Sequence, residues 1–87
     1  MRHVIFTDGF KKQANKLCRK NPSLRKQLAK QFQIFSLGEY SPPIRLHKLR
    51  GRRSTQYAIW IESDLRAIAV KDGDAYIFFE LAAHDKY

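Results

Sequence analysis

The sequence predicts an α+β fold in which an antiparallel sheet carries a helical hairpin on one face. Two stretches in the first half have apolar residues at helical spacing, and short runs rich in β-branched and aromatic residues fill the second half. Tight-turn signals separate these runs, which favours antiparallel pairing. Because 87 residues suffice for one small core, we expect a single domain over residues 1–87.

The first predicted elements are a strand and a helix. The run "RHVIF" (2–6) is short, β-branched and aromatic, as strands are, and Thr7 or Asp8 can cap the helix that follows. That helix is indicated by an apolar stripe at spacings of i, i+4, i+7 and i+8, made of Phe10, Ala14, Leu17 and Cys18.

A second helix is predicted directly after the first. Asn21 is expected to cap it, with Pro22 in its first turn, where the missing N–H does no harm. Gly38 is expected to end it. The two helices should form a hairpin with a basic outer surface. The apolar stripe of the second helix is Leu24, Leu28, Phe32 and Phe35.

Three or four strands are predicted after a loop, which gives the order β-α-α-β-β-β. "IRLHKLRG" (44–51) alternates imperfectly and is expected to be a short or edge strand. "QYAIWIE" (56–62) and "LRAIAV" (65–70) are strands joined by a tight turn. Asp72-Gly73 is a strong hairpin signal, and it precedes the last strand, "AYIFFELAA" (75–83).

The charge of the chain favours a polyanionic partner. Seventeen Lys and Arg residues against eight Asp and Glu residues give a net charge of +9. Five of the basic residues lie in "RLHKLRGRR" (45–53), which holds no acid. Nucleic acid is the first candidate, although a merely solvated basic surface stays open.

The remaining composition indicates a cytoplasmic protein. No apolar stretch approaches the roughly 20 residues that a membrane span needs, and no signal-peptide pattern is present. The single cysteine, Cys18, allows no internal disulfide and fits a reducing cytosol. It lies on the apolar stripe of the first helix and is expected in the core.

Histidine, arginine, lysine and tyrosine are the remaining candidate residue types on the strands. They suit RNA cleavage without a metal or other cofactor. His3, His47 and His84 match no metal-ligand spacing, and no glycine-rich phosphate loop occurs. In such cleavage the ribose 2′-OH attacks the adjacent phosphorus while a base and an acid move protons and cations stabilise the phosphorane. Histidine suits the proton transfers at neutral pH, and arginine suits the phosphate.

Each candidate residue also has a plainer interpretation. Arg66, inside an apolar strand, faces solvent, pairs with an acid such as Asp64 or Glu80, or lines an anion site. His47 belongs to a basic cluster that could serve as an electrostatic docking surface. Trp60 is expected in the core rather than as a base-stacking residue. His84 could be an ordinary surface histidine, Asp64 a turn residue and Tyr87 an aromatic cap on the core.

The sequence resembles the RelE/YafQ family of ribosome-dependent mRNA endonuclease toxins from bacterial type II toxin–antitoxin pairs. The resemblance runs over nearly the whole chain, through "FKKQANKL", "NPSLRKQLAKQ", "LHKLRG", "SDLRAIAV" and the closing "HDKY". The order and spacing of these motifs are more specific than any one of them. The family fold has the same β-α-α-β-β-β order as the elements predicted from this sequence.

The resemblance implies a role for each candidate. Arg66 matches the arginine that holds the scissile phosphate, His84 a catalytic histidine or arginine, and Tyr87 a tyrosine used in chemistry or positioning. His47 and Asp64 match a histidine and an acid of the YafQ-like branch. Where that branch often carries another histidine, this chain has Trp60. The basic segment is expected to contact RNA through Arg45, Lys48, Arg50, Arg52 and Arg53.

The function implied is that of a translation-inhibiting toxin. The partners expected are mRNA, the ribosome with its rRNA, and a cognate antitoxin that covers the basic surface; no membrane is involved. Two other interpretations stay open. One is a ParE-like toxin that inhibits gyrase and needs no nuclease residues. The other is an RNA- or ribosome-binding module without catalysis.

Overall fold

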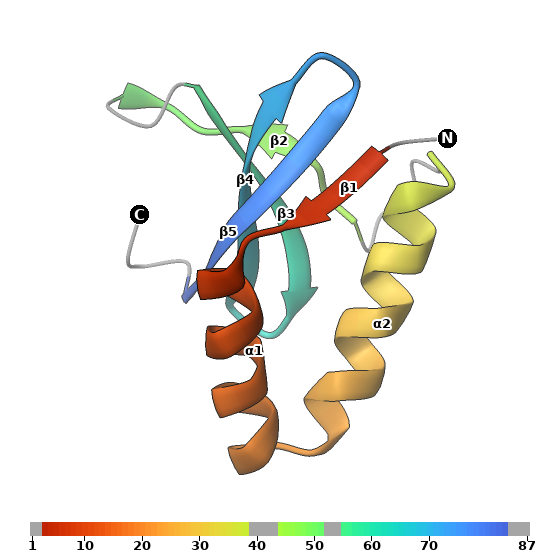
Figure 1. The fold of residues 1–87 in the computed structure, drawn as a ribbon, viewed down its shortest axis with the longest axis vertical. Coiled ribbons are helices and arrows are strands. Elements are labelled where there is room, and N and C mark those ends of the chain that lie inside the picture. The colour runs from red at the N-terminus through yellow and green to blue at the C-terminus, as the bar shows by residue number, and fades with distance from the viewer. Residues whose placement is uncertain (1–2, 39–43, 52–54, 84–87) are drawn as a thin grey trace.

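Two helices lie on one face of a five-stranded sheet (Figure 1). The computed structural model describes residues 3–38, 44–51 and 55–83. The strand order across the sheet is β1-β5-β4-β3-β2. The elements are β1 (His3–Phe6), α1 (Asp8–Lys20), α2 (Ser23–Ser36), β2 (His47–Lys48), β3 (Gln56–Glu62), β4 (Leu65–Asp72) and β5 (Ala75–Ala83).

The predicted fold class is confirmed, and the sheet differs from the prediction in one pairing. Strands β2 to β5 pair antiparallel, but β1 pairs in parallel with β5, with Val4 opposite Tyr76. A parallel pair needs a long connection, and the helices and three strands between β1 and β5 provide it. The sheet is therefore mixed, with the predicted short strand β2 at one edge.

The helix ends follow two of the three predicted signals. Thr7 caps α1, because its side chain accepts a hydrogen bond from the Phe10 N–H. Gly38 follows α2 with a φ of +80°, a left-handed conformation that glycine adopts without strain. The capping role predicted for Asn21 is wrong. Pro22 occupies the cap position of α2, and the Asn21 side chain accepts from the Ser23 hydroxyl instead.

The main core lies between the helices and the sheet. Phe78 of β5 is fully buried, and its ring contacts aromatic rings from β1 and both helices, among them Phe6, Phe32 and Phe35. Ile59 and Ile61 extend the same core from β3. Phe78 thus packs the last strand against β1 and both helices.

Replacing Phe78 by alanine is expected to lower the free energy of unfolding by about 3–5 kcal/mol, because a large buried ring would leave a cavity. Chemical denaturation measures this loss. Ile5, which is 44% exposed on β1, is the control. Ile5→Ala should cost well under half as much, and an equal cost at the two positions would contradict this description of the core.

The other face of the sheet has no helix on it in the described part of the chain. A small second cluster of buried side chains lies there, made of Leu49, Ala58, Ile68 and Ala82, with Phe79 packed against it. Residues that pair across neighbouring antiparallel strands point to the same face of the sheet. The strand register therefore shows which polar side chains lie on the same face as this cluster. This helix-free face carries the candidate site.

Candidate active site

Sheet register brings His47, Trp60 and Arg66 onto the helix-free face. His47 of β2 is opposite Ala58, which belongs to the second cluster. Trp60 of β3 is opposite Arg66 of β4, and Arg66 is opposite Ala82, another member of that cluster. Residues far apart along the chain therefore lie on one face of the sheet, with Trp60 and Arg66 near the ends of β3 and β4 that the turn joins.

Arg66 is anchored by backbone oxygens rather than by an acid. Its Nη1 donates hydrogen bonds to the carbonyl oxygens of Ser63, at 3.2 Å, and Leu65, at 3.3 Å. Within the described part of the chain it forms no ion pair, so the pairing with Asp64 or Glu80 that the sequence allowed is not seen. Arg66 is half-buried, and among the described residues its Nε–H and Nη2–H groups form no hydrogen bond, so they are available to an anion.

Ser63 joins Arg66 to Trp60. The Ser63 carbonyl also accepts a hydrogen bond from the Trp60 Nε1–H, at 2.8 Å. Ser63 has a φ of +47° in the tight turn between β3 and β4, which the sequence predicted. One carbonyl oxygen of a tight turn thus orients both an indole and a guanidinium.

Trp60 is not in the main core, so that prediction is wrong. Its neighbours Ile59 and Ile61 are fully buried on the helix-bearing side, and side chains along a strand alternate between faces. The Trp60 ring therefore lies on the helix-free face, where the Arg45 guanidinium is 5.2 Å from its centroid. The alternation "IWI" (59–61) in the sequence already indicated that Trp60 points away from the face of Ile59 and Ile61.

His47 has a preferred tautomer. Its Nδ1 lies 2.9 Å from the Arg45 carbonyl oxygen. Since a carbonyl oxygen only accepts, Nδ1 carries the hydrogen, and in the neutral ring Nε2 is left as a proton acceptor. The side chain is exposed at the edge of the sheet, where a substrate can reach it.

His47 and Arg66 share the helix-free face of the sheet. They are separated by β3, and their partners Ala58 and Trp60 are two residues apart. Strand spacings of about 4.8 Å and a rise of about 3.4 Å per residue place their Cα atoms about 12 Å apart.

Of the other predicted residues, some lie away from His47 and Arg66 and some lie outside the described residues. Asp64 is exposed in the turn beside Arg66. Lys48 is opposite Tyr57, which packs against the main core, so the register directs Lys48 away from His47. Arg50 is exposed beyond β2. The residues outside the described ranges are His84, Tyr87, Arg52 and Arg53.

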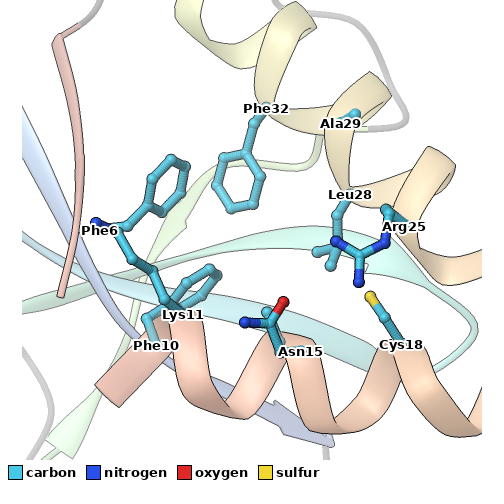
Figure 2. Close-up of a pocket in the computed structure, with 10 residues that line it drawn as sticks. Phe6, Phe10, Lys11, Asn15, Cys18, Arg25, Leu28, Ala29 and Phe32 are labelled. Atoms are coloured by element: carbon cyan, nitrogen blue, oxygen red, sulfur yellow. The ribbon is translucent and has the colours of Figure 1, made fainter. Parts of the chain in front are cut away.

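A groove of about 470 Å³ lies on the helix-bearing side, away from these residues. Figure 2 shows side chains of β1, α1 and α2 around it. Phe10, Phe32 and Leu28 give it apolar walls, and the exposed Lys11 and Arg25 add positive charge. The groove suits an apolar segment that also carries acidic side chains.

Two further features concern the described residues alone. No helix among them is both long and apolar enough to cross a membrane. No three His, Cys, Asp or Glu side chains within the described ranges gather closely enough to hold a metal ion.

Comparison with solved structures identifies the fold. A metal-bound toxin from Helicobacter pylori superimposes with a TM-score of 0.77 at 18% identity, over 99% of this chain and 98% of that one. The DinJ–YafQ toxin–antitoxin complex of E. coli gives 0.73 at 16%, over 98% and 94%. This chain has the fold of these toxins. The YoeB dimer of Staphylococcus aureus gives 0.70 at 13%, over 95% and 97%.

These neighbours confirm the resemblance to the RelE/YafQ family at the level of the fold. No family model matches the sequence, and no curated protein does. The shared fold extends over nearly the whole of both chains in each comparison. Within this toxin fold, the helix-free face and the tight turn of β3 and β4 hold the residues described above.

Proposed function

We propose that this chain is the toxin of a type II toxin–antitoxin pair and that it cleaves mRNA, with the ribosome presenting the substrate. The observation that carries the proposal is the group of His47, Arg45 and Arg66 on the helix-free face of a toxin fold. The net charge of +9 adds a general attraction for RNA.

The proposed reaction starts at the 2′-OH. His47 Nε2 takes the 2′-OH proton, and O2′ attacks phosphorus as the bond from phosphorus to O5′ breaks. Arg66 stabilises the additional negative charge on the phosphoryl oxygens. The products are a 2′,3′-cyclic phosphate, which water can open to a 3′-phosphate, and a free 5′-OH.

The acid that protonates O5′ is assigned to the end of the chain. Ala83, the last described residue, is opposite Leu65 and so lies beside Arg66. His84 follows directly, and Tyr87 is three residues further on. His84 is our first candidate for the acid and Tyr87 the second, and Asp64 in the turn is a candidate for orienting either one.

Inducible expression tests the function as a whole. We expect growth arrest with rapid loss of intact mRNA while DNA replication continues. Blocked replication with intact mRNA would instead identify a gyrase inhibitor, and normal growth would identify a binding module. Cleavage ends mapped on the mRNA should carry cyclic or 3′-phosphates.

We also propose that an antitoxin encoded beside this chain binds the groove between α1 and α2 with an amphipathic acidic segment. The apolar groove walls would take its apolar side chains, and Lys11 and Arg25 would pair with its carboxylates. The E. coli YafQ chain was solved in complex with DinJ, which supports a protein partner for the same fold.

Reversing two charges at the groove is expected to weaken this complex. Lys11→Glu with Arg25→Glu should raise the Kd for the antitoxin about tenfold or more, because two attractions become repulsions. Lys26→Glu with Lys30→Glu makes the same charge change on α2 outside the groove and is the control. Equal effects of the two double variants in a titration would mean that general charge, and not the groove, binds the partner.

A further inference from the structure

Trp60 contacts Arg45 directly and is linked to Arg66 through the Ser63 carbonyl oxygen. The Arg45 guanidinium lies over the indole ring, 5.2 Å from its centroid. At the edge of the ring, Nε1–H and Arg66 Nη1 donate to the same Ser63 carbonyl oxygen. One aromatic side chain is therefore in contact with Arg45 through its face and linked to Arg66 through its edge.

The contact with Arg45 leaves the guanidinium able to bind. A guanidinium that lies on an aromatic face keeps its N–H donors in its own plane. Within the described part of the chain, no hydrogen bond uses the donors of the Arg45 side chain. Arg45 is exposed, so these donors are accessible to an anion.

The backbone holds this arrangement in place. The Trp60 N–H donates to the Ile44 carbonyl oxygen at 2.8 Å, which fixes the segment before β2 against β3. Arg45 itself has a φ of +49°, a left-handed conformation that is unfavourable for arginine. Unfavourable backbone conformations of this kind persist where the surrounding structure imposes them, often at functional sites.

We propose that Trp60 is a positioning residue that holds Arg45 beside Arg66, so that the two guanidiniums contact neighbouring phosphates of one RNA strand. This proposal rests on the proposed function for the identity of the ligand. It assigns Trp60 no contact with a reacting atom. In this arrangement Arg66 binds the scissile phosphate and Arg45 the adjacent one.

RNA binding without cleavage tests the proposal. The probe is a labelled single-stranded RNA with 2′-O-methyl groups throughout, which cannot be cut by 2′-OH attack. Its affinity is measured at several salt concentrations. Arg45→Ala should lower the slope of log K against log salt by about 0.7, the value for one lost phosphate contact.

Trp60→Ala should lower the slope by the same amount, and the double variant should be no weaker than Arg45→Ala alone. Trp60→Phe keeps an aromatic face and should restore most of the slope. An unchanged slope in Trp60→Ala, or effects that add in the double variant, would overturn the proposal. Because the assay needs no cleavage, its result is independent of whether the chain is a nuclease.

Fluorescence of the wild-type protein gives a second test that does not depend on any variant folding. Trp60 is the single tryptophan of the chain, so its emission reports this site alone. If Arg45 stays on the ring, saturating the protein with the methylated RNA should quench the emission only slightly. Strong quenching would show a base stacked on the indole in place of Arg45 and would overturn the proposal.

Discussion

Replacing Arg66 by alanine is expected to slow mRNA cleavage by about 10²–10³-fold, the loss seen when one donor to a developing negative charge is removed. Arg66 is a half-buried residue on the helix-free face, next to the turn between β3 and β4, and backbone carbonyls already orient it. The measurement is the single-turnover rate of mRNA cleavage in a translating extract. Folding should be little affected, because the Ser63 carbonyl keeps its hydrogen bond from the Trp60 Nε1–H and Ser63 is exposed to water.

Two matched variants make this test specific. Arg66→Lys keeps the charge but loses the planar fork, so it should recover part of the rate and not all of it. Arg19→Ala removes an exposed arginine from α1 and should leave the rate nearly unchanged. Wild-type cleavage by Arg66→Ala would show that this face does not bind the scissile phosphate.

Replacing His47 by alanine is expected to slow cleavage by about 10²–10⁴-fold, the usual contribution of a general base. Asparagine at this position offers a sharper comparison. Its side-chain amide can still donate to the Arg45 carbonyl oxygen, as Nδ1 of His47 does, but it has no basic nitrogen in place of Nε2. His47→Asn should therefore be as slow as His47→Ala.

Comparing the two His47 variants distinguishes a role as the general base from a role in supporting the local structure. If His47→Asn cleaves mRNA at close to the wild-type rate while His47→Ala does not, the residue supports the Arg45 segment and is not the base. In that case His84 or Asp64 would have to take the 2′-OH proton. The same extract and the same single-turnover assay give both rates.

Much of the fold could be predicted because local patterns in this sequence agree with the final packing. The predicted ranges of β3 and β5 match the observed strands, since turn residues bound each hydrophobic run. The parallel pairing of β1 with β5 could not be predicted, because the sequence of a short strand does not determine which distant strand it will pair with.

The sequence named the residues of the candidate site but not their arrangement on the sheet. Arg66 stood out because a cation is rare among apolar strand residues, and His47 stood out as a histidine within the basic cluster of residues 45–53. Their joint position depends on how β2, β3 and β4 are aligned, which only the paired sheet defines. Trp60 was expected in the core, whereas the strand alternation set by Ile59 and Ile61 directs it to the other face.

The central claim is tested most directly by changing the substrate. An mRNA with one 2′-deoxynucleotide on the 5′ side of a mapped cleavage site lacks the attacking oxygen and nothing else. In a translating extract with the wild-type protein, we expect no cut at that phosphate and unchanged cutting at the other sites. Cleavage at the deoxy position at the normal rate would contradict 2′-OH attack and, with it, the roles of His47 as the base and Arg66 as the phosphate-binding cation.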